Sequence, residues 1–369
     1  MITPEFLVPN KLEFELPFGT CKNKCIFCSN YGGETATSPL TKEESFKVVS
    51  DFIEMGGETL VVTGGEPLEC PFCLELIRYA KDEGLKIYVY SAGYLVNKEV
   101  SENFFSIGVD RVYVTILGSE KTHDWITKVV GSYKCSFMAI DTFVRRGIYV
   151  GINFIPMKPN WREWKFVFQT IAKLGVNEFR ITELMPQGRA WDNRNLLELN
   201  LSEYSEMLYE MSAQLPSLLS TNKVKIVTEG ICFGFLINDQ LFPLPTCSAG
   251  KTGLTITPEG FIIPCLGCRT KPGLKTPDKK YILAKYSLVP FNLMKKIWYE
   301  SQILQEFREL NIENLEGPCK ECKERKKCKG GCPIRREIET GSTKIGPDFK
   351  CILKNRFKIN QGNRRMNND

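Results

Sequence analysis

The chain of 369 residues is long enough for one large domain or two ordinary ones, with an ample buried core. A hydrophobic content of 43% and a charged content of 25% are those of a soluble globular protein, and no apolar run approaches the roughly 18 to 20 residues that span a bilayer. The formal net charge of +6 is concentrated in two segments, residues 320–336 and the tail from Lys354 to Arg365, so nucleic acid is a disfavoured partner.

The first residues, Met1 to Glu5, lack the basic start of a secretory signal, which predicts a cytoplasmic protein without a membrane partner. The chain contains 15 cysteines. A reducing cytosol keeps thiols free, so the cysteines do not indicate a disulfide scaffold. Metal or cluster ligation remains as their use.

A first strand, Leu12 to Leu16, leads into the motif Cys21-Lys-Asn-Lys-Cys25-Ile-Phe-Cys28. Three thiolates at this spacing hold one side of an iron-sulfur cube but leave one iron open to a ligand that is not protein. Structural zinc needs four protein ligands, and the nearest spare ones are far off in the chain: Cys70, Cys73 and the single histidine, His123. The spacing therefore favours an iron-sulfur cluster over zinc.

Up to residue 183, β-rich runs alternate with amphipathic segments. Further strands are predicted at Thr59–Thr63, Lys86–Ser91, Arg111–Ile116, Tyr149–Ile155 and Glu178–Thr182, and helices at 41–55, 71–83, 97–107, 134–146 and 161–174. Thr41 and Glu44 form a capping box at the first helix, and four of the helices stop at a glycine: Gly84, Gly108, Gly147 and Gly175. Six such repeats imply parallel strands, in either an open doubly wound sheet or a partial barrel.

The run Gly64-Gly65-Glu66-Pro67 directly follows the second strand. It is not a GxGxxG fingerprint, which disfavours a dinucleotide-binding fold. The cysteine motif, with the aromatic Phe27 before its last cysteine, and this GGEP turn together resemble the radical S-adenosylmethionine (SAM) enzymes. That resemblance implies an α/β partial (β/α)6 TIM-type barrel over residues 1–183, with the chemistry at the carboxyl ends of the strands.

The resemblance also implies how the barrel binds its cofactors. The open iron of a 4Fe-4S cluster on Cys21, Cys25 and Cys28 would chelate SAM, and an electron donor such as ferredoxin or flavodoxin would reduce that cluster. SAM contacts would come from the GGEP turn and from strand ends: Gly64, Gly65, Glu66, Pro67, Ser91, Thr115 and Asn153. Leu184 and Met185 would cover the adenine, whereas Thr127-Lys128 stands where the family often has an arginine. His123 is more readily structural than catalytic.

Residues 184–246 indicate a connecting segment with one helix near 202–214. Beyond it the composition changes, because nine of the fifteen cysteines lie between Cys232 and Cys351. A β-hairpin around Pro258-Glu-Gly260 would bring Cys265 back near Cys247, and a CxxCxxxxxCxxxC run begins at Cys319. A zinc ribbon would account for that run alone, but it would leave Cys247, Cys265 and Cys351 without a purpose.

This pattern resembles the SPASM domain, an iron-sulfur extension of one radical SAM subgroup, over residues 247–352, followed by a basic tail at 353–369. The resemblance implies a first auxiliary 4Fe-4S cluster on Cys247, Cys265 and Cys332, with Cys268, or less readily Cys232, as a fourth ligand. It implies a second on Cys319, Cys322, Cys328 and Cys351. Cys70 and Cys73, beside helix residues, are expected to be buried structural thiols.

The predicted function is that of a radical SAM oxidoreductase acting on a peptide or protein, with modification of haem-pathway tetrapyrrole side chains as the alternative. Only twenty residues precede Cys21, so a leader-binding domain is not expected there. Leu266 follows Cys265, where the resemblance implies an acid in the sulfatase-maturing members, which argues against that activity. Basic residues between 268 and 285 suit an acidic peptide or propionate groups. A hypothesis of another class is a non-catalytic zinc or iron-sulfur module that binds nucleic acid.

Overall fold

The structure, a computed structural model, describes residues 8–17, 21–32, 38–243, 246–269, 279–286 and 293–354. Three sequence predictions fall partly or wholly outside these residues. They concern the proline-rich stretch ending at Pro245, the basic residues between 270 and 278, and the tail beyond Lys354.

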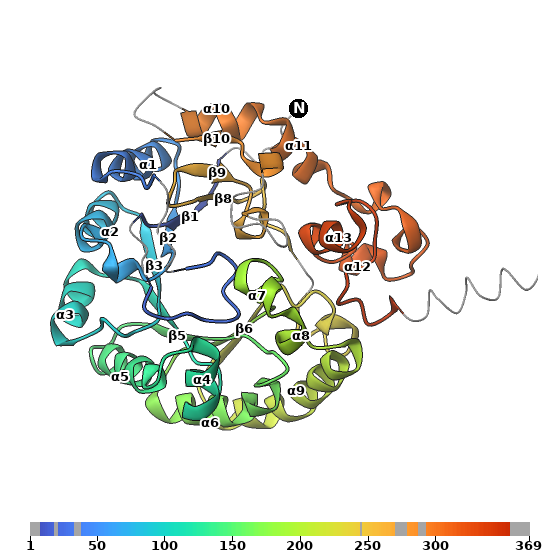
Figure 1. Ribbon diagram of the computed structural model, residues 1–369, viewed down its shortest axis with the longest axis horizontal. Helices are drawn as coiled ribbons and strands as arrows, with labels where there is room; N and C mark the ends of the chain where they lie inside the picture. Colours follow the sequence, from blue (N-terminus) through green and yellow to red (C-terminus); the bar gives the residue numbers. More distant parts are fainter. Residues whose placement is uncertain are drawn as a thin grey trace, which may run out of the picture.

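One ten-stranded sheet organises the chain, in the order β10-β9-β8-β1-β2-β3-β4-β5-β6-β7. Strands β1 to β7 are parallel neighbours, and Figure 1 shows them curving into an open ring. The predicted partial barrel is therefore confirmed. The seven strands are β1 (Lys11–Glu15), β2 (Thr59–Thr63), β3 (Lys86–Ser91), β4 (Arg111–Thr115), β5 (Val150–Phe154), β6 (Glu178–Thr182) and β7 (Lys225–Glu229).

Helices cover the outer face of this ring (Figure 1). The outer helices are α1 (Lys42–Glu54), α2 (Cys73–Asp82), α3 (Lys98–Ile107), α5 (Ser132–Arg145), α6 (Trp164–Leu174) and α9 (Leu201–Thr221). Thr41 and Glu44 form the predicted capping box of α1. The four glycines predicted to stop helices all have positive φ, and Gly108 and Gly175 are themselves left-handed C-caps.

Two parts of the sheet were missed by the sequence analysis. β7 lies inside the segment interpreted as a connection, and it pairs in parallel with β6. The cysteine hairpin, β8 (Gly253–Ile256) and β9 (Phe261–Ile263), was predicted correctly, but β8 also pairs in parallel with β1, and β10 (Ala284–Lys285) pairs with β9. The first residues of the Cys-rich region therefore extend the barrel sheet rather than standing apart from it.

Side chains alternate between the two faces of the barrel strands, as period-two geometry requires. Leu12 and Phe14 of β1, like Val112 and Val114 of β4, are fully buried in the core beneath the outer helices. The opposite face is polar and aromatic: the Tyr113 ring stacks on Tyr90 at 4.7 Å, and the Arg180 guanidinium lies 4.6 Å from the same ring. This stack lies one or two residues before the carboxyl ends of the strands, where the site is built.

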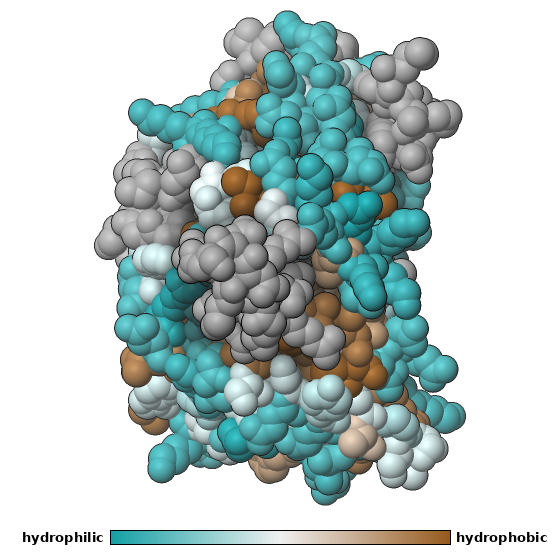
Figure 2. Space-filling view, turned by 90° about the vertical axis from the view of Figure 1, so that its right-hand side faces the viewer, coloured by the Kyte–Doolittle hydropathy of each residue, from teal (hydrophilic) through white to brown (hydrophobic). Residues whose placement is uncertain are grey.

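The last cysteines, from Cys319 to Cys351, lie in a region of loops and short helices at one side of the ring, among them α12 (Arg325–Cys328) and α13 (Pro333–Thr340) (Figure 1). The surface on that side is largely hydrophilic, with a hydrophobic area in its lower half (Figure 2). The predicted basic segment 320–336 is divided, because its lysines are mostly exposed whereas Arg335 and Arg336 are buried. In the described part of the chain, no helix is long and apolar enough to cross a membrane.

Candidate active site

The loop that follows β1 brings the three predicted thiols together. Its backbone is held by α4 (Glu120–Thr127), because the Lys24 amide donates to the Thr127 carbonyl at 2.9 Å and the Ile26 amide to the Ile126 carbonyl at 3.0 Å. Burial raises the pKa of Cys21 to about 11, and burial together with the charges of Cys28 and Cys21 raises the pKa of Cys25 further. Thiols that disfavour one another's ionisation in this way are suited to a shared cation, which would offset their charge.

The GGEP turn lies against this loop. Gly64 has φ +135°, and a Cβ there would come within 3.1 Å of the Leu16 amide nitrogen, so only glycine lets β2 turn this close to β1. Glu66 is fully buried. Its carboxylate accepts from Ser91 Oγ at 2.9 Å, from the Ala92 amide at 2.7 Å and from the Leu68 amide at 3.3 Å. Burial nevertheless raises the pKa of Glu66 to about 7.

The remaining predicted SAM contacts lie along the same sheet edge, but not all are free for a ligand. Ser91 ends β3 and donates to Glu66, so its hydroxyl orients the carboxylate. Thr115 ends β4 and is in register with Asn153 of β5. Asn153 Oδ1 accepts from Thr182 Oγ1 at 2.5 Å. Pro67 starts the short 3-10 turn that Glu66 caps.

An apolar group adjoins the cysteine loop on its α4 side. It contains Leu184, as the adenine prediction requires, together with Ile26, Leu117, Ile155 and Met157, with Phe27 packed against it. Met185 is not part of this group; it packs with the hairpin cysteines, and a Cβ on Gly267 would meet its Cε at 2.6 Å. Only the first of the two predicted adenine-covering residues therefore lies in the apolar group.

His123 anchors the loop after β4. It is 1% exposed, and its Nδ1 accepts from the Leu117 amide at 3.2 Å. Burial lowers its pKa to about 4, so the imidazole is neutral near pH 7. The neighbouring Thr127 is also buried and bonds back to the His123 carbonyl. These contacts agree with the structural role predicted for the histidine.

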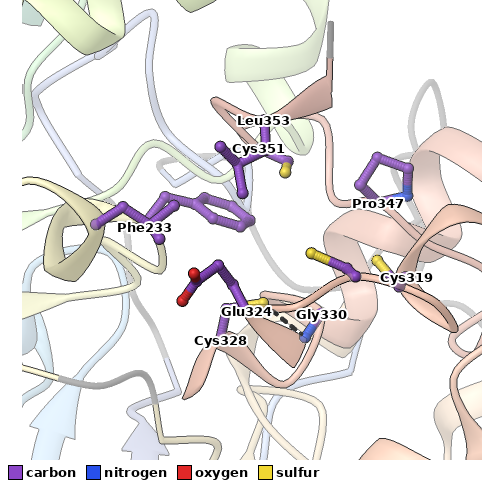
Figure 3. A pocket seen from close by; sticks show the side chains of 10 residues that line it. Phe233, Cys319, Glu324, Cys328, Gly330, Pro347, Cys351 and Leu353 are labelled. Carbon is purple, nitrogen blue, oxygen red and sulfur yellow. Dashed lines mark hydrogen bonds between the residues drawn. The ribbon is translucent and has the colours of Figure 1, made fainter. Parts of the chain in front are cut away.

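Four C-terminal cysteines line a single pocket: Cys319, Cys322, Cys328 and Cys351. Figure 3 shows the sulfur atoms of the labelled cysteines around it, with the Phe233 ring on one side and the Glu324 carboxylate nearby. The Gly330 amide donates to Cys328 Sγ at 3.3 Å. This set matches the predicted second auxiliary site, and Phe233 and Glu324 were not anticipated as its neighbours.

The hairpin cysteines form a second group. Cys265 Sγ and Cys268 Sγ are 3.6 Å apart, and the hydrogen bond between the two thiols lowers the pKa of Cys265. Burial and the charges of Cys265 and Cys332 raise the pKa of Cys247. Burial, the bond to Cys265 and the charge of Cys332 raise the pKa of Cys268. Burial and the charge of Cys332 also raise the pKa of Cys232, but the sulfur of Cys232 accepts a hydrogen bond from Arg335 Nη2 at 3.2 Å. The unassigned Cys70 and Cys73 are buried in the core, and Cys135 is exposed.

The parallel barrel sheet carries three close thiols after its first strand and a buried carboxylate after its second. This arrangement is typical of enzymes that bind an iron-sulfur cluster and use SAM. Residues 16–171 match the family model of the Radical SAM superfamily, so this part of the chain is a radical SAM domain. The chain is therefore an enzyme with a radical SAM domain, and its cofactors include SAM and a 4Fe-4S cluster. The resemblance to radical SAM enzymes is confirmed for this domain, and the structural matches together with the Cys-rich C-terminal region are consistent with a SPASM-type extension.

Relatives with named activities match over most of their length. The chain is 25% identical to the AdoMet-dependent heme synthase of Methanosarcina barkeri, covering 90% of this chain and 93% of that protein. It is also 25% identical to the PqqA peptide cyclase of Ruegeria pomeroyi, over 89% and 84% of the two chains.

Solved structures share the fold at low identity. Streptococcus suis SuiB bound to S-adenosylmethionine is 16% identical with a TM-score of 0.72, covering 94% of this chain and 77% of SuiB. The structure of native anSMEcpe with bound AdoMet is 17% identical with a TM-score of 0.71, over 97% and 98% of the two chains.

Proposed function

We propose that the protein is an oxidoreductase that cleaves SAM reductively and uses the resulting radical to abstract hydrogen from a peptide or protein. The observation that carries this proposal is the meeting of Cys21, Cys25 and Cys28 with the Glu66 turn at one edge of the barrel. The proposed SAM contacts are Gly64, Gly65, Glu66, Pro67, Thr115 and Asn153, with Ser91 acting through Glu66. We further propose a cytoplasmic location.

The bound cluster would supply one electron that splits SAM into methionine and a 5'-deoxyadenosyl radical, and a ferredoxin or flavodoxin would provide that electron. The chain's own residues bind and orient. Glu66 would accept the amino hydrogens of SAM, and the apolar group around Leu117 and Leu184 would exclude water from the nucleoside. The Tyr90–Tyr113 stack with Arg180 closes the barrel interior beneath.

We propose two auxiliary 4Fe-4S clusters in residues 247–352. In this division of the chain the barrel domain of residues 1–183 and the segment 184–246 come first, and the tail 353–369 follows. Cys247, Cys265, Cys268 and Cys332 would hold the first, and the four pocket cysteines the second. In the described part of the chain, no three His, Cys, Asp or Glu side chains converge closely enough for a single metal ion.

Cys268 is proposed as the fourth ligand because of its contact with Cys265, whereas Cys232 is engaged by Arg335. Cys268→Ala should lower the iron content from about twelve to about eight per chain, or leave an open iron whose paramagnetic spectrum shifts on adding cyanide. Cys232→Ala, the matched control, should do neither. The opposite pattern, with Cys232 sensitive and Cys268 silent, would reassign the ligand.

The peptide or protein substrate is supported by several similar proteins. SuiB has been solved bound to the precursor peptide SuiA and anSMEcpe with a Cp18Cys peptide, and PqqA peptide cyclases are among the relatives. A second candidate is a haem-pathway tetrapyrrole, favoured by the AdoMet-dependent heme synthase of Methanosarcina barkeri, which matches over 93% of its length. The nucleic-acid-binding module has no comparable support.

Anaerobic reconstitution tests the proposal. The protein with iron and sulfide should hold about twelve irons and, with dithionite, convert SAM to methionine and 5'-deoxyadenosine. Bound zinc without iron, or no cleavage, would overturn it. Adding an iron porphyrin that carries propionate side chains separates the candidates: stoichiometric decarboxylation would replace the peptide proposal by the tetrapyrrole one, and no binding or product would support the peptide.

A further inference from the structure

A short segment, residues 185–193, lies across the loop that carries Cys21, Cys25 and Cys28. We call that loop, residues 21–32, the SAM-cluster loop, and we call the segment the α7 bridge after its helix α7 (Gly188–Asp192). Arg189 donates through Nε to the Cys25 carbonyl at 2.9 Å and through Nη2 to the Gly32 carbonyl at 2.7 Å. The bridge also donates to carbonyls between them, from the Ala190 amide to Cys28 at 3.3 Å and from Asn193 Nδ2 to Ile26 at 3.4 Å. Four carbonyls of the cluster loop therefore depend on one distant segment.

Close packing fixes the same contact. Gly188 has φ +55°, and a Cβ at this position would lie 2.6 Å from the Ser29 carbonyl group and 2.7 Å from the Cys28 oxygen. Any side chain here would push α7 off the loop. The helix thus touches the backbone of a predicted ligand without an intervening side chain.

The other end of the bridge reaches the hairpin cysteines. Gln187 is 2% exposed, and its Nε2 donates to the Gly267 carbonyl at 2.5 Å. Gly267 lies between Cys265 and Cys268, so this bond holds the turn that presents both thiols. The amide orientation is fixed by chemistry, since a carbonyl can only accept, and Gln187 Oε1 is left buried without a partner among the described residues.

A second connection joins the same two loops. Asn30, beside Cys28, donates through Nδ2 to Glu15 Oε1 at 2.5 Å, and Glu15 forms a buried ion pair with Arg269, the residue after Cys268. Burial lowers the pKa of Arg269 to about 10, which still leaves the guanidinium charged near pH 7. The Gln187–Gly267 bond and the Glu15–Arg269 pair are buried, where polar contacts are costly to break.

We propose that the α7 bridge couples the two cysteine loops, so that the state of the hairpin cysteines sets the position of the SAM-cluster loop, with Gln187 and Arg189 as positioning residues. The inference rests on the proposed function, because it takes both loops as cluster-binding. Filling or emptying the hairpin site would move Gly267, and the Gln187 bond would pass that change through α7 to residues 25–32.

Hydrogen exchange of the reconstituted full chain measures this coupling. Cys265→Ala, which removes a hairpin ligand, should speed amide exchange in residues 21–32 by about two- to tenfold, the range of one buried hydrogen bond. Gln187→Leu, which keeps the volume and loses the donor, should do the same. The double variant should exceed either single variant by less than the sum of the two effects, because both changes act in part through the Gln187–Gly267 bond.

Controls separate coupling from general damage. Gln305→Ala on the exposed face of α11 (Gln302–Glu309) should leave exchange in 21–32 unchanged. Gln187→Glu, which places an acceptor opposite the Gly267 carbonyl, keeps the test valid if the leucine variant does not fold. Additive effects, or no effect of Cys265→Ala on residues 21–32, would overturn the coupling. If the unaltered chain binds iron and cleaves SAM, that result leaves the proposed function standing; if it does neither, the function itself fails.

Discussion

Cys21→Ala is expected to abolish reductive cleavage of SAM while about eight of about twelve irons remain bound. Cys21, Cys25 and Cys28 are the only protein ligands proposed for the cluster that binds SAM, and the loop that carries them has no further cysteine to replace one of them. Removing one leaves two sulfurs, which do not hold a cube. The auxiliary cysteines come from other parts of the chain, the loops and short turns around the β8–β9 hairpin and around α12 and α13, and two sets of them meet around separate sites.

The measurement is iron content together with 5'-deoxyadenosine formed under dithionite, in anaerobic protein. Cys135→Ala is the matched control, because that thiol is exposed on α5 and is assigned to no cluster. Its iron and cleavage should equal those of the unaltered chain. Cleavage that survives Cys21→Ala would contradict the ligand assignment, and loss of all iron would show that the barrel and auxiliary regions do not load independently.

The barrel was predictable because its signals are local. Each strand from β1 to β6 is a short segment in which apolar residues alternate with other residues or follow one another. Glycines such as Gly108 end helices by adopting positive φ, a preference that glycine shows in any chain. β7 escaped notice because its burial is only partial and its place depends on pairing with β6. The parallel pairing of β8 with β1 joins residues about 240 positions apart, which no local pattern records.

The predictions for the site show the same contrast between local signals and contacts that are distant in sequence. Cysteine spacing and the GGEP turn indicated loops that the structure brings together, because the three thiols of the first motif lie close in sequence. Ser91 was predicted at the right strand end, but its bond to Glu66 is visible only once β2 and β3 are aligned. Gln187 and Arg189 were missed, since their partners lie 80 and 164 residues away. The run Met185-Pro-Gln-Gly-Arg-Ala in an apparent connection was the available signal.

Glu66→Gln is expected to weaken SAM binding by about ten- to a hundredfold, the cost of losing a charged hydrogen-bond acceptor in a buried site. A glutamine keeps the shape but turns one acceptor into a donor, which would face either the Ser91 hydroxyl or the Ala92 amide. Equilibrium binding of SAM to the reconstituted protein measures the change. Glu58→Gln, an exposed residue just before the opposite end of β2, is the control and should bind SAM normally.

The same residue gives a pH dependence whose sign follows from its burial. The pKa of Glu66 is raised from 4.5 to about 7, so the folded, cluster-free chain favours the protonated carboxyl. Its contribution to stability is fully present below pH 4.5, falls as the pH rises towards 7, and is constant above that. Relative to Glu66→Gln, the unaltered chain should therefore lose about 3 kcal/mol of unfolding free energy over this window. Urea titrations at several pH values measure it, and a difference that stays flat or grows with pH would show that the carboxylate is stabilised as the anion.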